Sequence, residues 1–334
     1  MQKQQHILTD NWGRQMDYLR IAITDRCNLR CFYCMPEEGI HYLPKKELLT
    51  YEEILRLTQI FSSLGVKKVR ITGGEPFIRK DLMHLLKGIK AIEGIESLNI
   101  TTNGVLTESF IPEMKELGIN HVNLSLDSLD PENFFRITRR NEYQKVMSTL
   151  DALLSHGIHT KINMVVMNGK NEGEIISMAE LARHKNIEVR FIEEMPFNGS
   201  ETQQSKIWSA PQILETLRSH YPNLTAIQGD PHAPATQYTS PELNGSIGII
   251  AAYSRSFCHG CNRIRLTATG TIKNCLYDNG VLDLKELMRS GTSDDQIKET
   301  LISTVKKKEK DGIIAEANRQ NDAGITESMS TIGG

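Results

Sequence analysis

Short β-branched segments alternate with amphipathic segments up to about residue 195, and this alternation limits the folds open to the chain. Strands are predicted at residues 19–23, 68–71, 98–100, 121–126, 160–166 and 187–192. Helices are predicted between them at residues 51–64, 82–92, 109–117, 144–155 and 174–184. Strands joined by helical crossovers run parallel. We therefore predict an α/β fold, an open or partial (βα)6 TIM-like barrel, although a doubly wound sheet would give the same pattern.

Local signals mark the ends of the predicted helices. Thr50 and Glu53 form a possible capping box at the start of the first helix. Gly65, Gly118 and Gly157 fall where three helices should end, as C-cap glycines do.

The regular alternation stops near residue 196. Residues 199–205 and 230–244 are predicted as loops, with a helix at 211–219 between them, and the charged run 306–310 as a solvated helix face. A chain of 334 residues exceeds the usual size of one domain. We predict a barrel domain at residues 1–235 and a smaller C-terminal α+β domain at 236–334.

Composition excludes several classes of protein. The net charge of −2 gives no reason to expect nucleic acid or a membrane surface as a partner. No apolar run approaches the roughly 20 residues that span a bilayer, and residues 1–15 lack the apolar core of a secretory signal. A cytoplasmic location is expected, where six cysteines are better explained as ligands or catalysts than as disulfides.

Three cysteines, Cys27-x3-Cys31-x2-Cys34, directly follow the first predicted strand. A 4Fe–4S cluster normally takes four thiolates, so three would leave one iron open to bind a small molecule. A zinc site with His41 as fourth donor is the alternative, although zinc sites usually show paired short spacings. The spacing favours an iron–sulfur cluster.

This spacing, with Tyr33 before Cys34, resembles the signature of the radical S-adenosylmethionine superfamily. The resemblance implies that the open iron binds S-adenosylmethionine, whose reductive cleavage gives a 5′-deoxyadenosyl radical that abstracts hydrogen. Gly73-Gly74 resembles the motif that holds the methionine amino group. Polar groups at the ends of four strands (residues 72–76, 101–104, 125–127 and 193–195) favour one shared site.

A second set, Cys258-x2-Cys261-x13-Cys275, again has three thiols and no fourth. A zinc site that includes His259 is the main alternative, but His259 lies between two of the cysteines, which makes joint ligation awkward. A second open-iron cluster is favoured. Arg263 and Arg265 alternate on a strand and so share one face, which suits phosphate oxygens, unless they are ordinary surface charges.

The two cysteine sets together resemble the GTP 3′,8-cyclases of molybdenum cofactor biosynthesis, over nearly the whole chain and least at residues 197–246. The resemblance implies conversion of GTP, with S-adenosylmethionine, to (8S)-3′,8-cyclo-7,8-dihydroguanosine 5′-triphosphate, using two 4Fe–4S clusters with three cysteine ligands each. It implies S-adenosylmethionine contacts at Tyr33, Gly74, Ser125 and Met195. It implies GTP contacts at Arg20, Arg70, Thr101, Lys161, Arg263, Ile264 and Arg265, with Arg263 and Arg265 in the catalytic centre.

The same resemblance implies a flavodoxin or ferredoxin as electron donor, a downstream cyclic pyranopterin monophosphate synthase, a possible homodimer and a mobile Gly333-Gly334 tail. The sequence carries neither a P-loop nor a dinucleotide fingerprint, so scattered Arg and Lys side chains would hold a triphosphate. Two alternatives stay open: a peptide-modifying radical S-adenosylmethionine maturase with an auxiliary cluster, and a zinc-dependent binding module.

Overall fold

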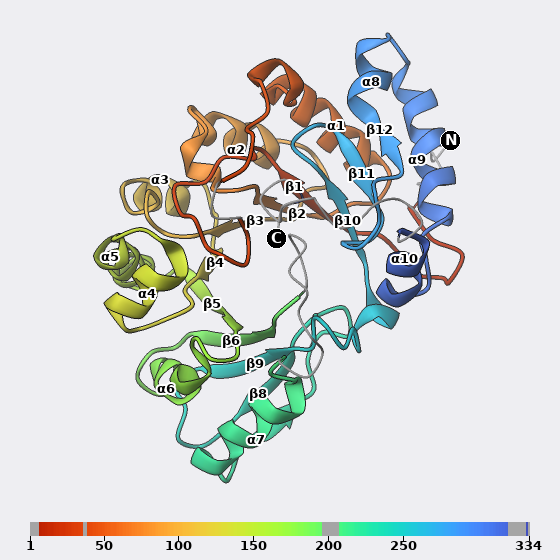
Figure 1. The fold of residues 1–334 in the computed structure, drawn as a ribbon. Helices are drawn as coiled ribbons and strands as arrows, with labels where there is room; N and C mark the ends of the chain where they lie inside the picture. Colours follow the sequence, from red (N-terminus) through yellow and green to blue (C-terminus); the bar gives the residue numbers. More distant parts are fainter. Residues whose placement is uncertain (1–6, 36–38, 196–206, 320–331, 333–334) are drawn as a thin grey trace.

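The computed structural model describes residues 7–35, 39–195, 207–319 and 332. Its centre is one 12-stranded sheet with the order β12-β11-β10-β1-β2-β3-β4-β5-β6-β9-β8-β7 (Figure 1). The first six strands are β1 (Tyr18–Ala22), β2 (Lys68–Thr72), β3 (Ser97–Thr102), β4 (His121–Ser125), β5 (His159–Val166) and β6 (Glu188–Glu193). The others are β7 (Thr225–Ile227), β8 (Thr236–Thr239), β9 (Ser246–Ile250), β10 (Arg263–Leu266), β11 (Thr271–Lys273) and β12 (Leu282–Asp283).

Helices cover the outer side of this curved sheet (Figure 1). They are α1 (Tyr51–Ser63), α2 (Leu82–Lys90), α3 (Ile111–Glu116), α4 (Pro131–Thr138), α5 (Tyr143–Ser155), α6 (Ile175–His184), α7 (Ala210–His220), α8 (Leu284–Arg289), α9 (Asp294–Lys306) and α10 (Gly312–Arg319). Strands β1 to β6 follow one another in order and pair in parallel. A doubly wound sheet would reverse its strand order, so the predicted partial barrel is confirmed.

Two further parallel strands extend the barrel beyond the six that the sequence predicts. β10 pairs with β1, and β9 pairs with β6. The linear strand order leaves the barrel open within the described residues. The sheet crosses residue 235 without a break, because β8 and β9 pair with each other beyond it and β9 pairs with β6. The domain boundary at 235 therefore stays a prediction.

The local signals act as expected. The Thr50 hydroxyl accepts from the Glu53 amide at 3.2 Å, and the Glu53 carboxylate accepts from the Thr50 amide at 2.8 Å. The three glycines that end helices have positive φ angles of 93°, 76° and 64° (Gly65, Gly118 and Gly157). Helix α4 is not in the sequence prediction. Its N-cap is Asp130, whose carboxylate accepts from the Glu132 amide at 2.9 Å.

The barrel strands carry apolar residues on one face and polar residues on the other. Val69 and Ile71 of β2 belong to one buried apolar cluster that includes helix residues, and Ile162 and Met164 of β5 belong to a second such cluster. The intervening residues must point to the opposite face, which is the barrel interior. The interior of this barrel is therefore lined with polar and charged side chains.

The charged run at 306–310 is not a solvated helix face. Helix α9 ends at Lys306, and Lys308 is only 4% exposed. The predicted loop at 199–205 and the Gly333-Gly334 tail lie outside the described residues. No helix within the described ranges is long and apolar enough to cross a membrane.

Candidate active site

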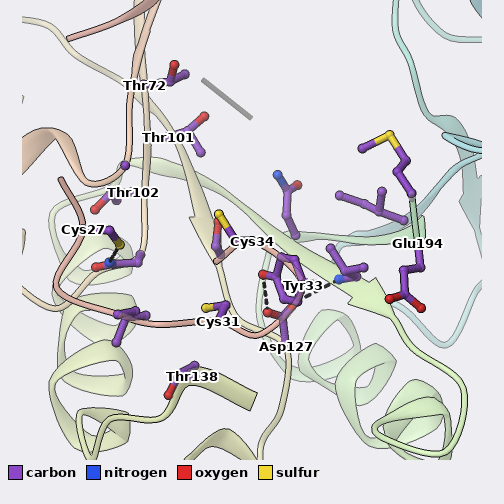
Figure 2. A pocket seen from close by; sticks show the side chains of 18 of the residues that line it. Cys27, Cys31, Tyr33, Cys34, Thr72, Thr101, Thr102, Asp127, Thr138 and Glu194 are labelled. Atoms are coloured by element: carbon purple, nitrogen blue, oxygen red, sulfur yellow. Dashed lines mark hydrogen bonds between the residues drawn. The ribbon is translucent and has the colours of Figure 1, made fainter. Parts of the chain in front are cut away.

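The first cysteine set lines a cavity of about 230 Å³ at the carboxyl ends of the barrel strands (Figure 2). Cys27, Cys31 and Cys34 reach it from the loop that follows β1. The same cavity is lined by Tyr33, Gly74, Ser125 and Met195, all four of the positions predicted to contact S-adenosylmethionine. The structure thus brings the seven residues to one cavity, and their ligand contacts stay predictions.

The thiols of this set lack enough positive charge nearby to ionise them: burial outweighs Arg30, which favours the thiolate of Cys27. Burial raises the pKa of Cys27 to about 11. Burial, and next the nearby Asp127 carboxylate, hold the pKa of Cys31 well above its usual value. All six cysteines are free thiols. Iron would supply the missing charge, because a coordinating thiol is deprotonated by its metal, so this donor set fits an iron–sulfur cluster.

A single zinc ion fits less well. A structural zinc ion would need a fourth protein ligand besides the three cysteines of either set. His41 and His259, the histidines considered as fourth ligands, are exposed, and His259 Nδ1 lies 3.1 Å from the Ser256 carbonyl oxygen.

Asp127 ties the cysteine loop to the barrel. Its carboxylate accepts from the Tyr33 hydroxyl at 2.7 Å and from the Val165 amide at 2.9 Å (Figure 2). Burial raises the pKa of Asp127 to about 6. The sequence placed Asp127 among the polar residues at strand ends, but its contact with Tyr33 depends on the tertiary structure.

Gly74 holds the cysteine loop from the other side. Its amide donates to the Thr24 carbonyl at 2.8 Å, and the Glu75 amide donates to the Arg26 carbonyl at 2.8 Å. A Cβ at Gly74 would lie 2.2 Å from the Arg26 carbonyl oxygen, so only glycine fits this close backbone approach. The Gly-Gly motif therefore positions the residue directly before Cys27.

Glu75 connects this motif to the end of β3. It is fully buried, and its carboxylate accepts from the Asn103 amide at 2.7 Å and the Thr102 hydroxyl at 2.8 Å. Asn103 in turn donates through Nδ2 to Cys27 Sγ at 3.6 Å. Burial raises the pKa of Glu75 to about 7.

Three predicted GTP contacts form a row inside the barrel. Arg265 of β10, Arg20 of β1 and Arg70 of β2 are register partners on adjacent strands. Burial, and next the charge of Arg265, hold the pKa of Arg20 well below its usual value. Burial, and next Arg263, lower the pKa of Arg265 to about 10. Such crowded, buried cations favour binding of a polyanion.

Thr101 joins this row to the cavity of the first cysteine set. Arg70 Nη1 donates to the Ile100 carbonyl at 3.0 Å and to Thr101 Oγ1 at 3.4 Å. Thr101 also lines the cavity with the three cysteines (Figure 2). The site for a small molecule and the site for a polyanion are therefore neighbours.

Lys161 is already paired in this structure. Its Nζ lies 2.6 Å from Glu188, which also accepts from Arg190 Nε at 2.6 Å. Burial opposes ionisation of Glu188, but Arg190 and Lys161 outweigh it and lower its pKa to about 2. Glu188 and Arg190 were not predicted from the sequence as site residues. The two residues are two positions apart within a predicted strand and so share one face, and this pattern could have indicated a charged pair inside the barrel.

The second cysteine set lies beside the arginine row. Cys258 and Cys261 precede β10, and Cys275 follows β11. Burial opposes ionisation of Cys261, but Lys308 and Arg263 outweigh it and lower its pKa to about 6. Soft thiolate donors among cations suit an anionic iron–sulfur cluster. Ile264 differs from the prediction in one respect: its fully buried side chain packs in the apolar core, so only its backbone is suited to meet a ligand.

The fold and the family models define the class of protein. Residues 21–182 match the model described as Radical SAM superfamily, and residues 187–313 match the model described as Molybdenum Cofactor Synthesis C. The fold is similar to that of Streptococcus suis SuiB, with a TM-score of 0.60, 16% identity, and coverage of 86% of this chain and 69% of that chain. The chain is a radical S-adenosylmethionine enzyme.

Curated relatives narrow the class. "GTP 3′,8-cyclase" of Thermodesulfovibrio yellowstonii is 40% identical over 89% of this chain and 93% of its own. "GTP 3′,8-cyclase, mitochondrial" of Arabidopsis thaliana is 40% identical over 90% of this chain and 78% of its own. The chain spans 54% of "Molybdenum cofactor biosynthesis protein 1" of Drosophila melanogaster, at 40% identity over 91% of this chain. The chain belongs to the GTP 3′,8-cyclase family.

Proposed function

We propose that this chain converts GTP and S-adenosylmethionine to (8S)-3′,8-cyclo-7,8-dihydroguanosine 5′-triphosphate, the first step of molybdenum cofactor biosynthesis. The observation that carries the proposal is the row of Arg265, Arg20 and Arg70, partly or fully buried, next to the cavity of the first cysteine set. A triphosphate would relieve the repulsion between these guanidinium groups through charge-assisted hydrogen bonds.

The first cysteine set would hold one 4Fe–4S cluster, which supplies the electron for reductive cleavage of S-adenosylmethionine. The chain's part is to orient that molecule. Gly74, which lines the cavity, would meet its methionine amino group with backbone atoms. Tyr33, held by Asp127, and Ser125 and Met195 would enclose the rest of the molecule.

The second cysteine set, Cys258, Cys261 and Cys275, would hold another 4Fe–4S cluster, whose iron without a cysteine ligand would be available to bind the GTP base. Arg263 and Arg265 would bind phosphate oxygens beside it, with Arg20, Arg70, Thr101 and Lys161 completing the GTP site. Lys161, whose ammonium group is paired with Glu188 in this structure, would be one of these GTP contacts.

A peptide-modifying maturase is less well supported. The solved structure of SuiB is described as bound to a precursor peptide, but at 16% identity the likeness shows the fold alone. The relatives at 40% identity carry the cyclase name. We extend the proposal to an electron donor such as flavodoxin or ferredoxin, a downstream cyclic pyranopterin monophosphate synthase, a homodimer and a cytoplasmic location.

The test is anaerobic incubation of the reconstituted protein with S-adenosylmethionine, a strong reductant and each nucleoside triphosphate separately. GTP should stimulate release of 5′-deoxyadenosine above the level without substrate, and ATP, CTP and UTP should not. Equal release with and without GTP would show that the substrate assignment is wrong. Metal analysis of the same sample should give about eight irons per chain, against two zincs for a binding module.

A further inference from the structure

Lys308 is a buried lysine that joins two cysteine-bearing segments of the second set. It lies between α9 and α10 and is 4% exposed. Its Nζ donates to the Arg263 carbonyl at 3.0 Å and to the Asn274 carbonyl. Arg263 lies two residues after Cys261, and Asn274 lies directly before Cys275. One ammonium group therefore spans the backbone beside two of the three thiols.

The N-terminal hairpin around residues 9–15 fixes the segment that carries Lys308. Trp12 Nε1 donates to the Lys308 carbonyl at 3.1 Å. Arg14 donates to the Glu309 carbonyl at 2.6 Å and to the Cys258 carbonyl at 2.9 Å. Asp10 orients Arg14 through an ion pair of 2.6 Å. The hairpin thus links the segment of Lys308 to the backbone of Cys258, the remaining cysteine of the set.

In the described part of the chain the Lys308 ammonium group forms no ion pair with a carboxylate: its Nζ donates to the two backbone carbonyls, and its charge favours the ionised form of Asp278 from a greater distance. Burying a charge without an opposite charge is costly. Thiolates that bind a metal cluster are deprotonated and would supply that opposite charge beside the ammonium group. The neighbouring Lys306 and Lys307 are exposed, so this arrangement is particular to Lys308.

We propose that Lys308 is a positioning residue of the second cluster, which holds the Cys261 and Cys275 segments together and raises the cluster's reduction potential. The inference rests on the proposed second cluster. Reduction adds one electron, and a nearby cation stabilises the more negative form. Removal of the charge should therefore make the potential more negative, and removal of the hydrogen bonds should loosen cluster binding.

The experiment compares Lys308→Met, Lys308→Gln and the matched exposed control Lys307→Met. Iron per chain is measured first in the otherwise unchanged holoenzyme. The potential is then measured by anaerobic redox titration followed by electron paramagnetic resonance, in full-length protein that also carries Cys27→Ala, Cys31→Ala and Cys34→Ala. In that background only the second cluster contributes a signal. Both Lys308 variants should shift the potential to more negative values than Lys307→Met.

Lys308→Gln keeps donors for the two carbonyls, so it should retain more iron than Lys308→Met while showing the shift. Potentials equal to that of Lys307→Met in both variants would overturn the inference. If Lys308→Met does not fold, the potential of Lys308→Gln decides. The experiment also separates failure of this inference from failure of the proposed function. If the second cluster does not exist, the Lys307→Met control would hold only the four irons of one cluster in the holoenzyme.

Discussion

The two cysteine sets have the same number of thiols but differ in the number of cationic side chains near them. The cavity of the first set is lined by acidic residues, including Asp127, Glu193 and Glu194, and by no Lys or Arg of the described chain. The second set lies beside Arg263, Arg265 and the buried Lys308. S-adenosylmethionine carries a sulfonium cation, whereas GTP carries a triphosphate. Under the proposed function, the charged residues around the thiols, more than the thiols themselves, would assign the first set to the cofactor and the second to the substrate.

The largest effect expected to test this division comes from the second set. Cys275→Ala should keep the first cluster, with about four irons per chain, and lose GTP turnover. Cys31→Ala should instead abolish formation of 5′-deoxyadenosine. Iron analysis and product chromatography measure both. Full GTP turnover by Cys275→Ala would remove the second cluster from the mechanism.

Gly74→Ala should damage the first set alone. The new Cβ would lie 2.2 Å from the Arg26 carbonyl oxygen and displace the loop before Cys27. We expect loss of the first cluster, so that iron falls from about eight to about four per chain. Gly173→Ala is the matched control, because a Cβ there would meet nothing within 4 Å and the φ of Gly173 is not positive. Equal iron in the two variants would contradict the positional role of Gly74.

Arg265→Ala should weaken binding of GTP without weakening binding of S-adenosylmethionine. Loss of a charged hydrogen bond costs about 1.5–3 kcal/mol, or roughly ten-fold to more than a hundred-fold in apparent GTP affinity. Binding of S-adenosylmethionine should not change. Because the arginine row is mutually repulsive and buried, the variant should lose little stability in thermal unfolding. Unchanged GTP affinity would show that Arg265 does not bind the substrate.

Glu75, beside the first cysteine set, should give the folded protein a pH-dependent stability without changing either ligand site. Burial raises its pKa to about 7 from the usual 4.5, so the folded protein holds this proton more tightly than the unfolded chain. The contribution is complete below about pH 4.5 and is lost as pH rises through 7. The loss amounts to about 3 kcal/mol at most. Urea unfolding of the cluster-free protein should show this slope, and Glu75→Gln should not.

Much of the fold was predictable because its signals are local. The alternation of strands and helices, the Thr50–Glu53 capping box and the C-cap glycines depend on residues a few positions apart. A strand at Arg263 and Arg265 was expected, but its place beside β1 was not, and β9 was not predicted at all, because both strands follow loop-rich sequence and their partners β1 and β6 are distant in the chain. The spacing within each cysteine set is also local, which is why both sets could be recognised.

By itself the sequence determined which chemistry the chain can carry: two sets of three thiols, a Gly-Gly motif and two alternating arginines. Only the tertiary structure decided the register that aligns Arg265, Arg20 and Arg70, and the burial of Lys308 against the carbonyls of Arg263 and Asn274. The reason is physical. Spacing along the chain fixes which residues share a face, whereas strand register and burial arise from contacts between segments that are distant in sequence.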